Sequence, residues 1–291
     1  METILEVRNV SKKFKNFALE DFSFNVKKGR IVGFIGRNGA GKTTTLKGIM
    51  NLLNFDEGEV FFMGNDMKTH EKEAKQEIGF ALSELNYYPN KTIKDMADVI
   101  SRFYPNFSKE RFDKLTNYFN LDIKKKLQEL SSGMKVKYSL ALALSHDAKL
   151  LILDEPTSGL DPISRDEILD IFKSLVKEGE RSIIFSTHIT SDLDKCADDI
   201  LYIKEGKKVY EGTKENFVKE YFLISGPLNQ FDSTLERVAL ANKKEGDKFE
   251  ALIKSSDERL LEGKNIDKKE PDLEQIMVYL ERGKHHEEFI L

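Results

Sequence analysis

Residues 36–43 read GRNGAGKT, which fits the pattern G-x-x-x-x-G-K-[ST] at every defined position. The apolar run over 30–35 is typical of a buried strand, and residues 44–52 have the composition of a helix. Glycines let the backbone N–H groups of such a loop turn towards phosphate oxygens, and a helix N-terminus adds positive potential there. The strand, loop and helix together predict a nucleotide-phosphate site in an α/β fold, and they disfavour a chance glycine-rich turn.

Two residues that end this loop predict specific contacts with a nucleotide. The Lys42 ammonium can reach the β- and γ-phosphates, and the Thr43 hydroxyl can ligate Mg²⁺. The loop by itself predicts a nucleotide-binding protein and does not say which reaction follows.

A second segment, residues 149–155, reads KLLILDE, an apolar run that ends in two carboxylates. Central parallel strands are apolar on both faces, and α/β sheets bind ligands at the carboxyl ends of their strands. Asp154 is therefore a candidate to hold Mg²⁺ through water, and Glu155 is the candidate base that deprotonates the attacking water. The alternative is a strand that ends in a solvated acidic turn with no role in catalysis. The presence of a phosphate loop in the same chain disfavours this alternative.

Composition and charge place further limits on the function. The chain has 291 residues, 40% hydrophobic and 33% charged, which is typical of a soluble globular protein. The net charge of −4 and the lack of a strongly basic tract predict no nucleic-acid partner. Cys196 is the only cysteine, which excludes an intramolecular disulfide and favours a cytosolic setting. We expect neither a signal peptide nor a membrane span of about 20 apolar residues, so another chain would supply any spans.

Changes in composition and hydrophobic pattern along the chain predict two domains, 1–214 and 215–291. Within the first, amphipathic helices predicted at 92–104, 108–119 and 122–128 form a helical insertion over about 84–146. The second is predicted to be a small α+β appendage. Strands are predicted in it at 221–225 and 249–254, and helices at 231–241 and 272–280. The stretches 243–248 and 264–270 are predicted to be charged loops.

Three further short motifs accompany the phosphate loop in the sequence. Residues 130–134 read LSSGM at the start of a predicted helix, 158–161 read SGLD, and His188 follows an apolar strand. Each alone has a simple structural explanation: a helix N-cap, a turn and a structural histidine. Their order and spacing relative to the phosphate loop argue against coincidence.

With these motifs the sequence closely resembles the ATP-binding-cassette (ABC) ATPases, the nucleotide-binding subunits of ABC transporters, over roughly residues 3–213. The resemblance implies a P-loop α/β core with an antiparallel β subdomain and a helical subdomain, followed here by the α+β appendage. It implies ATP and Mg²⁺ as cofactors and ATP hydrolysis as the activity.

The resemblance also implies roles for individual residues. It implies catalytic roles for Lys42, Glu155 and His188, the last as the switch histidine that contacts the γ-phosphate. It implies ATP binding by Phe14, Gly36, Asn38, Gly39, Gly41, Lys42, Thr43, Thr44, Ser131, Gly133 and Asp161. Phe14 stands where the family stacks an aromatic ring on adenine, with a core role as the alternative. Metal binding falls to Thr43 and Asp154, with Ser83 or Glu84 as a further candidate.

The sequence departs from the family pattern at two motifs. In the signature motif, usually LSGGQ, Ser132 replaces the first glycine and Met134 replaces glutamine. A serine at a helix N-terminus can still cap or bind phosphate, so we expect function to survive. Ser83 stands where the family has the glutamine of the Q-loop, and Glu84 or a water would have to substitute for it.

The resemblance implies two protein partners. Two cassettes, identical or different, close head-to-tail so that the signature of one covers the γ-phosphate held by the other. A separate transmembrane permease docks near the helical insertion, whose aromatic residues form either a docking surface or a local core: Tyr87, Tyr88, Phe103, Tyr104 and Phe107. The protein would then be cytoplasmic and peripheral on the cytoplasmic face of the cell membrane.

Residues 270–280 resemble the ending of ABC-2-type exporter ATPases, and the modified signature resembles that of Gram-positive peptide exporters. We therefore expect the ATP-hydrolysing subunit of an exporter that moves a peptide or amphipathic substrate through a separate transmembrane subunit. The alternatives are an exporter of lipids or small-molecule antibiotics and a soluble ABC-type ATPase acting on ribosomes or DNA. A P-loop kinase or GTPase would lack the signature, and a regulatory or immunity protein that binds ATP without turnover stays open because of Ser83.

Overall fold

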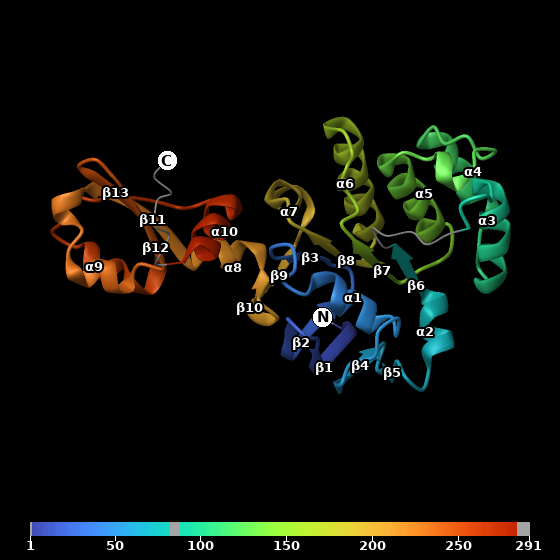
Figure 1. Ribbon diagram of the computed structural model, residues 1–291, viewed down its shortest axis with the longest axis horizontal. Coiled ribbons are helices and arrows are strands. Elements are labelled where there is room, and N and C mark those ends of the chain that lie inside the picture. The colour runs from blue at the N-terminus through green and yellow to red at the C-terminus, as the bar shows by residue number, and fades with distance from the viewer. Residues whose placement is uncertain (1, 82–87, 284–291) are drawn as a thin grey trace. The chain divides into compact units, whose positions relative to one another are not determined.

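The computed structural model describes residues 2–81 and 88–283 (Figure 1). The chain divides into two compact units, 1–211 and 212–291. No helix in the described ranges is both long enough and apolar enough to cross a membrane.

The first unit is built on a six-stranded sheet in the order β10-β9-β3-β8-β7-β6. Its strands are β3 (Ile31–Ile35), β6 (Ile78–Ala81), β7 (Leu150–Asp154), β8 (Ser182–Thr187), β9 (Asp199–Lys204) and β10 (Lys207–Thr213). Strands β6, β7, β8, β3 and β9 pair in parallel. Every residue of β3, β7 and β8 is buried, as expected for strands that are covered on both faces. The carboxyl ends of these three neighbouring strands therefore lie together at one edge of the sheet.

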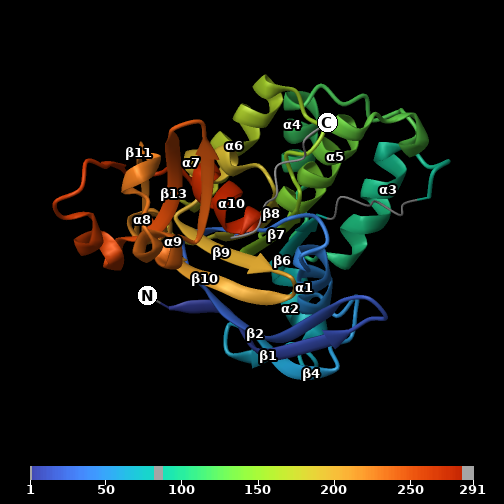
Figure 2. The same cartoon turned by 60° about the vertical axis from the view of Figure 1, so that its left-hand side comes forward.

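Helices and a second sheet cover the two faces of this central sheet (Figures 1 and 2). Helices α6 (Pro162–Val176) and α7 (Thr190–Cys196) lie over one face, and α1 (Lys42–Ile49) lies over the other. Beyond α1 is an antiparallel sheet in the order β2-β1-β4-β5, formed by β1 (Thr3–Lys13), β2 (Ala18–Lys27), β4 (Glu57–Phe62) and β5 (Asn65–Asp66). Phe22 and Phe24 of β2 pack on Phe34 of β3, so one apolar core joins the two sheets. The predicted antiparallel β subdomain is confirmed.

The predicted helical subdomain is also present, but one of its predicted helices is not. It contains α3 (Ile93–Ile100), α4 (Lys109–Tyr118) and α5 (Ser132–Leu144), which start from hydroxyl caps at Thr92, Ser108 and Ser131. The short helix α2 (Glu71–Glu77) precedes it in the chain. The helix predicted at 122–128 is wrong: only a 3₁₀ turn forms, at Leu127–Glu129. The backbone of this segment bonds instead to the start of α3, because Lys125 O accepts from Ile93 N and Leu127 N donates to Lys91 O.

His146 follows α5 and is a buried histidine held neutral by its surroundings. Its ring stacks on Tyr104 at 4.1 Å, and its Nδ1 has no hydrogen-bond partner among the described residues. Burial, and then the charge of Arg111, lowers the pKa of His146 from 6.5 to about 4. The unfolded chain therefore binds a proton at this side chain between these two values, and the folded chain does not.

The first prediction concerns pH and stability. A depressed histidine pKa gives stability that is present above pH 6.5 and is lost as the pH falls towards about 4. We expect His146 to make the free energy of unfolding about 2 kcal/mol lower at pH 5 than at pH 7. Urea unfolding followed by circular dichroism should show His146→Asn losing this share of the pH dependence. The exposed His70 gives the control, and a His70→Asn variant with the same loss would contradict the assignment.

The second unit is a four-stranded antiparallel sheet in the order β12-β13-β11-β14, with helices on both faces. Its elements are α8 (Lys214–Lys219), β11 (Tyr221–Pro227), α9 (Ser233–Val238), β12 (Ala241–Glu245), β13 (Lys248–Lys254), β14 (Asp267–Lys269) and α10 (Leu273–Arg282). Ile224 and Ile253 pack with Leu235 of α9 in one core. Leu223 and Leu252 directly precede Ile224 and Ile253 in their strands, so their side chains lie on the opposite face of the sheet, where they are also buried. Helix α10 packs on β12 and β13.

The α+β class of this appendage is confirmed, and three of its predicted segments are corrected. The helix predicted at 231–241 is shorter, because Asp232 caps it at Ser233 and the chain enters β12 at Ala241. The segment predicted as a loop at 243–248 contains the end of β12 and the start of β13. The segment predicted as a loop at 264–270 contains β14. These segments are charged because their side chains are mostly exposed to solvent, while cross-strand hydrogen bonds still fix the backbone.

Candidate nucleotide site

The phosphate loop joins β3 to α1, and its conformation requires glycine at two positions. Gly41 has φ 114°, and a Cβ there would lie 2.8 Å from Phe17 Cζ. A Cβ at Gly36 would lie 2.4 Å from the carbonyl oxygen of Ile203. The loop can therefore approach its neighbours, and present backbone N–H groups at the start of α1, only because side chains are absent.

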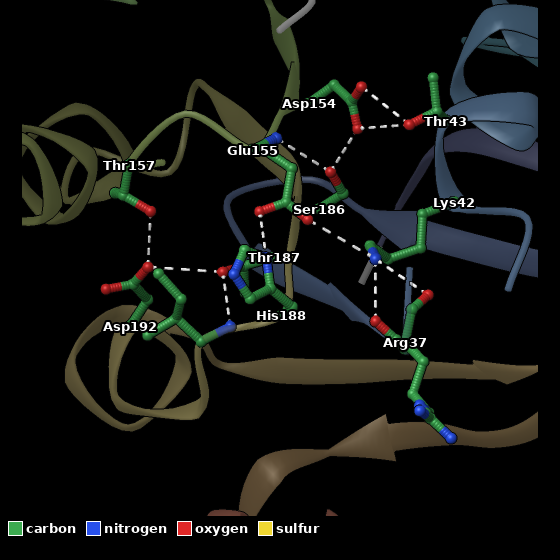
Figure 3. Close-up of polar contacts among 12 residues, drawn as sticks. Arg37, Lys42, Thr43, Asp154, Glu155, Thr157, Ser186, Thr187, His188 and Asp192 are labelled. Carbon is green, nitrogen blue, oxygen red and sulfur yellow. Dashed lines mark hydrogen bonds and ion pairs between the residues drawn. The ribbon is translucent and has the colours of Figure 1, made fainter. Parts of the chain in front are cut away.

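Lys42 is buried, and its side chain points back toward this loop. Its Nζ donates to the carbonyl oxygen of Gly36 at 2.8 Å and contacts that of Arg37 at 3.4 Å. The same Nζ lies 3.5 Å from Glu155 Oε1 (Figure 3). The structure thus brings the cation of the loop to the carboxylate that follows β7, as the two sequence motifs predict.

Asp154, the last residue of β7, is buried among hydroxyl groups. Thr43 Oγ1 donates to its two carboxylate oxygens, at 3.1 Å from Oδ1 and 2.9 Å from Oδ2. Ser186 Oγ on the neighbouring strand β8 donates to Oδ1 at 2.6 Å (Figure 3). The parallel register places Asp154 directly opposite Ser186, so the sheet itself fixes this contact.

Glu155 has an unusual backbone conformation, with φ 51°, in the left-handed region that non-glycine residues seldom adopt. Its N–H donates to Ser186 Oγ at 3.0 Å and approaches the Ser186 carbonyl oxygen at 3.2 Å, which holds the turn. Its Oε2 lies 2.8 Å from His188 Nδ1, a distance at which a protonated Nδ1 donates to the carboxylate. Strained backbone of this kind is retained where surrounding structure over-determines it, typically at functional sites.

These groups surround a cavity of about 570 Å³. Its lining residues are Phe14, Phe17, Asn38, Gly39, Gly41, Lys42, Thr43, Thr44, Glu155, Ser158 and His188. Nine of these eleven were predicted from the sequence; Phe17 and Ser158 were not. Phe14 lies at the rim with 47% of its surface exposed, as a ring available for stacking would. Asp154 lies behind Thr43 and does not line the cavity.

Three predicted ATP-binding residues lie elsewhere in the unit. Ser131 caps α5 by accepting from Met134 N at 3.3 Å. Asp161 caps α6, and the hydrogen bonds that it accepts, first from Ser164 and then from Ile163, hold the pKa of its carboxyl below the usual range. A Cβ at Gly133 would lie 3.3 Å from Leu160, so the signature segment packs against the 158–161 turn of its own chain. None of the three lines the cavity.

The predicted metal candidates Ser83 and Glu84 lie outside the described residues. The hard oxygen donors of Thr43 and Asp154 fit Mg²⁺, which takes few protein ligands and completes its shell with phosphate oxygens and waters. Residues 2–81 and 88–283 contain no group of three or more His, Cys, Asp or Glu side chains arranged to hold a metal ion.

Two polar groups that support the site, Ser186 and Asp192, were not predicted from the sequence. Ser186 bonds both Asp154 and the Glu155 N–H, and its signal was a serine inside an otherwise apolar strand. Asp192 accepts from Thr157 Oγ1 at 2.6 Å, and no sequence motif pointed to it.

Comparison with known proteins agrees with this geometry. The chain matches the family described as ABC transporter over residues 19–158. It is 34% identical over 214 residues to the bacitracin transport ATP-binding protein BcrA of Bacillus licheniformis, covering 72% of this chain and 70% of that protein. It is 33% identical over 221 residues to the Nod factor export ATP-binding protein I of Burkholderia orbicola (strain AU 1054), covering 74% and 72%. A solved structure of the ATP-binding subunit of an ABC transporter superposes with TM-score 0.67 at 26% identity, covering 74% of this chain and 91% of that one.

The fold and site therefore define a P-loop ATPase cassette. The chain belongs to the ABC transporter family, as an ATP-binding and ATP-hydrolysing subunit.

Proposed function

We propose that this subunit of an exporter-type ABC system uses the cavity beside residues 36–43 to hydrolyse Mg·ATP, and that it thereby drives export through a separate permease. The observation that carries the proposal is the meeting of Lys42, Glu155 and His188 at one cavity, with Asp154 behind it. These residues come from the ends of three adjacent strands, which is where α/β sheets bind their ligands.

ATP is held at both of its ends. Adenine stacks on the exposed ring of Phe14, while the phosphates lie over the N–H groups of the glycine loop at the start of α1. The Lys42 ammonium exchanges its contact with the Gly36 carbonyl for the β- and γ-phosphate oxygens. Hydrogen bonds from an ammonium to phosphate oxygens are stronger than those between neutral groups, and burial of Lys42 limits the competition from water.

Thr43 and Asp154 hold Mg²⁺, the threonine directly and the carboxylate through water. Their oxygens lie within hydrogen-bond distance of each other, so the two hard oxygen donors that would hold the ion stand side by side. When bound, the ion neutralises charge on the β- and γ-phosphates and orients them.

Glu155 acts as the base. Water attacks the γ-phosphorus, the bond from this phosphorus to the bridging oxygen of ADP breaks, and the proton of the water passes to the Glu155 carboxylate. His188 lies next to Glu155 and donates to the γ-phosphate, which fixes the line of attack. The left-handed turn at Glu155 aims its carboxylate into the cavity.

A second cassette completes the site. The start of α5 leaves Ser131 and Ser132 exposed, and a helix N-terminus favours an anion. Ser131 and Gly133 of one subunit therefore cover the γ-phosphate held by the other, and Asp161 lies at the same face. ATP joins the two subunits, and loss of the γ-phosphate on hydrolysis releases them, because the contact with that phosphate differs between the two states.

The permease docks on exposed aromatic side chains of the helical subdomain, Tyr88 and Phe103, which are 71% and 70% exposed. Tyr104 and Phe107 belong to the local core instead, since they pack on His146 and Phe112. Tyr87 lies outside the described residues. Exposed aromatic side chains are enriched at protein interfaces, which supports a docking role for the first pair.

We further propose that the cargo is a peptide or another amphipathic molecule. The names of the relatives refer to bacitracin transport and Nod factor export, and residues 270–280 resemble the ending of exporter ATPases. The cargo contacts the permease rather than the cavity described here.

The second prediction tests the function by affinity capture from native membranes and mass spectrometry of the chains that co-purify. We expect a multi-span membrane protein of the ABC-2 type. The Tyr88→Ala/Phe103→Ala double variant should lose this protein, whereas Tyr118→Ala, which removes another exposed aromatic ring, should retain it. Recovery of ribosomal proteins or DNA with no membrane protein would overturn export while leaving ATP hydrolysis intact.

A further inference from the structure

Asp192 is a fully buried carboxylate in the first turn of α7, and the mechanism above does not use it. Its Oδ2 accepts from Thr157 Oγ1 at 2.6 Å and lies 3.5 Å from Thr187 Oγ1 (Figure 3). Thr157 and Thr187 are themselves buried, so water does not compete for these contacts. Both threonines belong to segments that carry reacting groups.

Thr157 comes two residues after Glu155, and Thr187 directly precedes His188. Thr187 Oγ1 also accepts from Ile189 N at 3.0 Å, which holds the backbone on the other side of the histidine. Asp192 thus connects the loop that follows β7 to the end of β8, from which the His188 loop starts (Figure 3). The two side chains that meet at 2.8 Å, Glu155 and His188, stand on these two loops.

Arg165 of α6 makes the buried charge of Asp192 tolerable. Its Nε donates to Asp192 Oδ1, and its guanidinium donates to Ser191 Oγ at 2.7 Å. A buried carboxylate without a partner is costly, so this ion pair sets the position of Asp192 against α6. The two carboxylate oxygens of Asp192 therefore bind different groups, since Oδ1 binds the arginine and Oδ2 binds the threonines.

We propose that Asp192 is a positioning residue for ATP hydrolysis, which holds the Glu155 loop and the His188 loop at a fixed separation. The left-handed backbone of Glu155 gives the reason that such a restraint is needed, because a strained turn relaxes unless its surroundings hold it. The inference rests on the roles of Glu155 and His188 in the proposed function. It concerns the chemical step rather than the binding of nucleotide, since Asp192 does not line the cavity.

The third prediction is that Asp192→Asn lowers kcat for ATP hydrolysis by about 10²-fold and leaves KM for ATP within about twofold. An asparagine has one acceptor oxygen in place of two. If that oxygen serves Thr157, the amide N–H groups face the Nε–H of Arg165, so one of the two connections breaks. Steady-state ATPase assays of the full chain, with circular dichroism to confirm the fold, measure the effect.

Asp199→Asn is the matched control. Asp199 likewise pairs with an arginine, although through both of its oxygens, at 2.9 Å from Arg30 Nε and 2.5 Å from Arg30 Nη2. This pair lies at the amino ends of β3 and β9, which is the opposite edge of the sheet from the cavity. Its loss should cost stability of a similar kind with little change in kcat. Equal kcat for the Asp192→Asn and Asp199→Asn variants would overturn the positioning role.

Thr157→Val is the second variant and keeps the ion pair of Asp192 with Arg165, so it tests the proposal even if Asp192→Asn fails to fold. We expect kcat to fall at least tenfold with KM unchanged, and no further fall when both substitutions are combined. Unchanged kcat in Thr157→Val, or losses that multiply in the double variant, would contradict the proposal. Failure of the wild-type chain to hydrolyse ATP would contradict the proposed function as well, which separates the two failures.

Discussion

Glu155→Gln is expected to lower kcat for ATP hydrolysis by about 10³-fold while the affinity for ATP changes by less than about threefold. Glutamine keeps the size of the side chain and an oxygen for His188, but it cannot accept the proton of the attacking water. The phosphate contacts of residues 36–43 remain. Turnover measured by phosphate release, and affinity measured with a fluorescent ATP analogue, separate the two quantities.

The same variant should accumulate an ATP-bound dimer, because the γ-phosphate that joins the two subunits in the proposed function is no longer removed. Size-exclusion chromatography with ATP and with ADP measures this directly. Glu180→Gln serves as the control, since Glu180 is an exposed glutamate whose ion pair with Lys28 is 3.3 Å long and plays no part in the site. Hydrolysis at the normal rate in Glu155→Gln would exclude Glu155 as the base.

Lys42→Ala is expected to weaken ATP binding by about 10²-fold and to bring hydrolysis below detection. The ammonium is buried, and each charge-assisted hydrogen bond that it makes to a phosphate contributes about 1.5–3 kcal/mol. Its removal also leaves Glu155 without its cation, 3.5 Å away, so negative charge faces the γ-phosphate. Isothermal titration calorimetry with ATP measures the binding, and phosphate release measures the turnover.

Lys47→Ala is the matched control, because Lys47 lies in the same helix and does not line the cavity. It should bind and hydrolyse ATP as the wild type does. The two predictions also test each other: Glu155→Gln keeps binding and loses turnover, whereas Lys42→Ala loses both. Tight ATP binding by a folded Lys42→Ala variant would mean that the loop N–H groups alone hold the phosphates.

The motifs of the nucleotide site could be predicted from the sequence because their chemistry is local. A glycine loop between a strand and a helix fixes both the backbone path and the position of Lys42. Likewise, an apolar strand that ends in two carboxylates places Asp154 and Glu155 at the edge of a parallel sheet. The resemblance to ABC ATPases was confirmed for the same reason.

Predictions from composition alone were weaker. Residues 122–128 have the lysines and leucine of a helix, yet their backbone bonds to the start of α3 instead. The charged stretches at 243–248 and 264–270 looked like loops because a strand at the edge of a sheet exposes its polar side chains. For 122–128 and 264–270 a partner distant in the sequence decided the backbone conformation, whereas 243–248 belongs to a hairpin that pairs with itself.

By itself, the sequence determined the phosphate loop, the acidic end of β7 and the P-loop class of the fold, since each depends on neighbouring residues. Only the tertiary structure decided the left-handed turn at Glu155 and the contact of Thr157 with Asp192, which is 35 residues away. A carboxylate such as Asp192 acquires its role from the loops and the arginine that folding brings to it. No local pattern records these contacts, because the residues that make them come from four separate segments: the loop after β7, α6, β8 and α7.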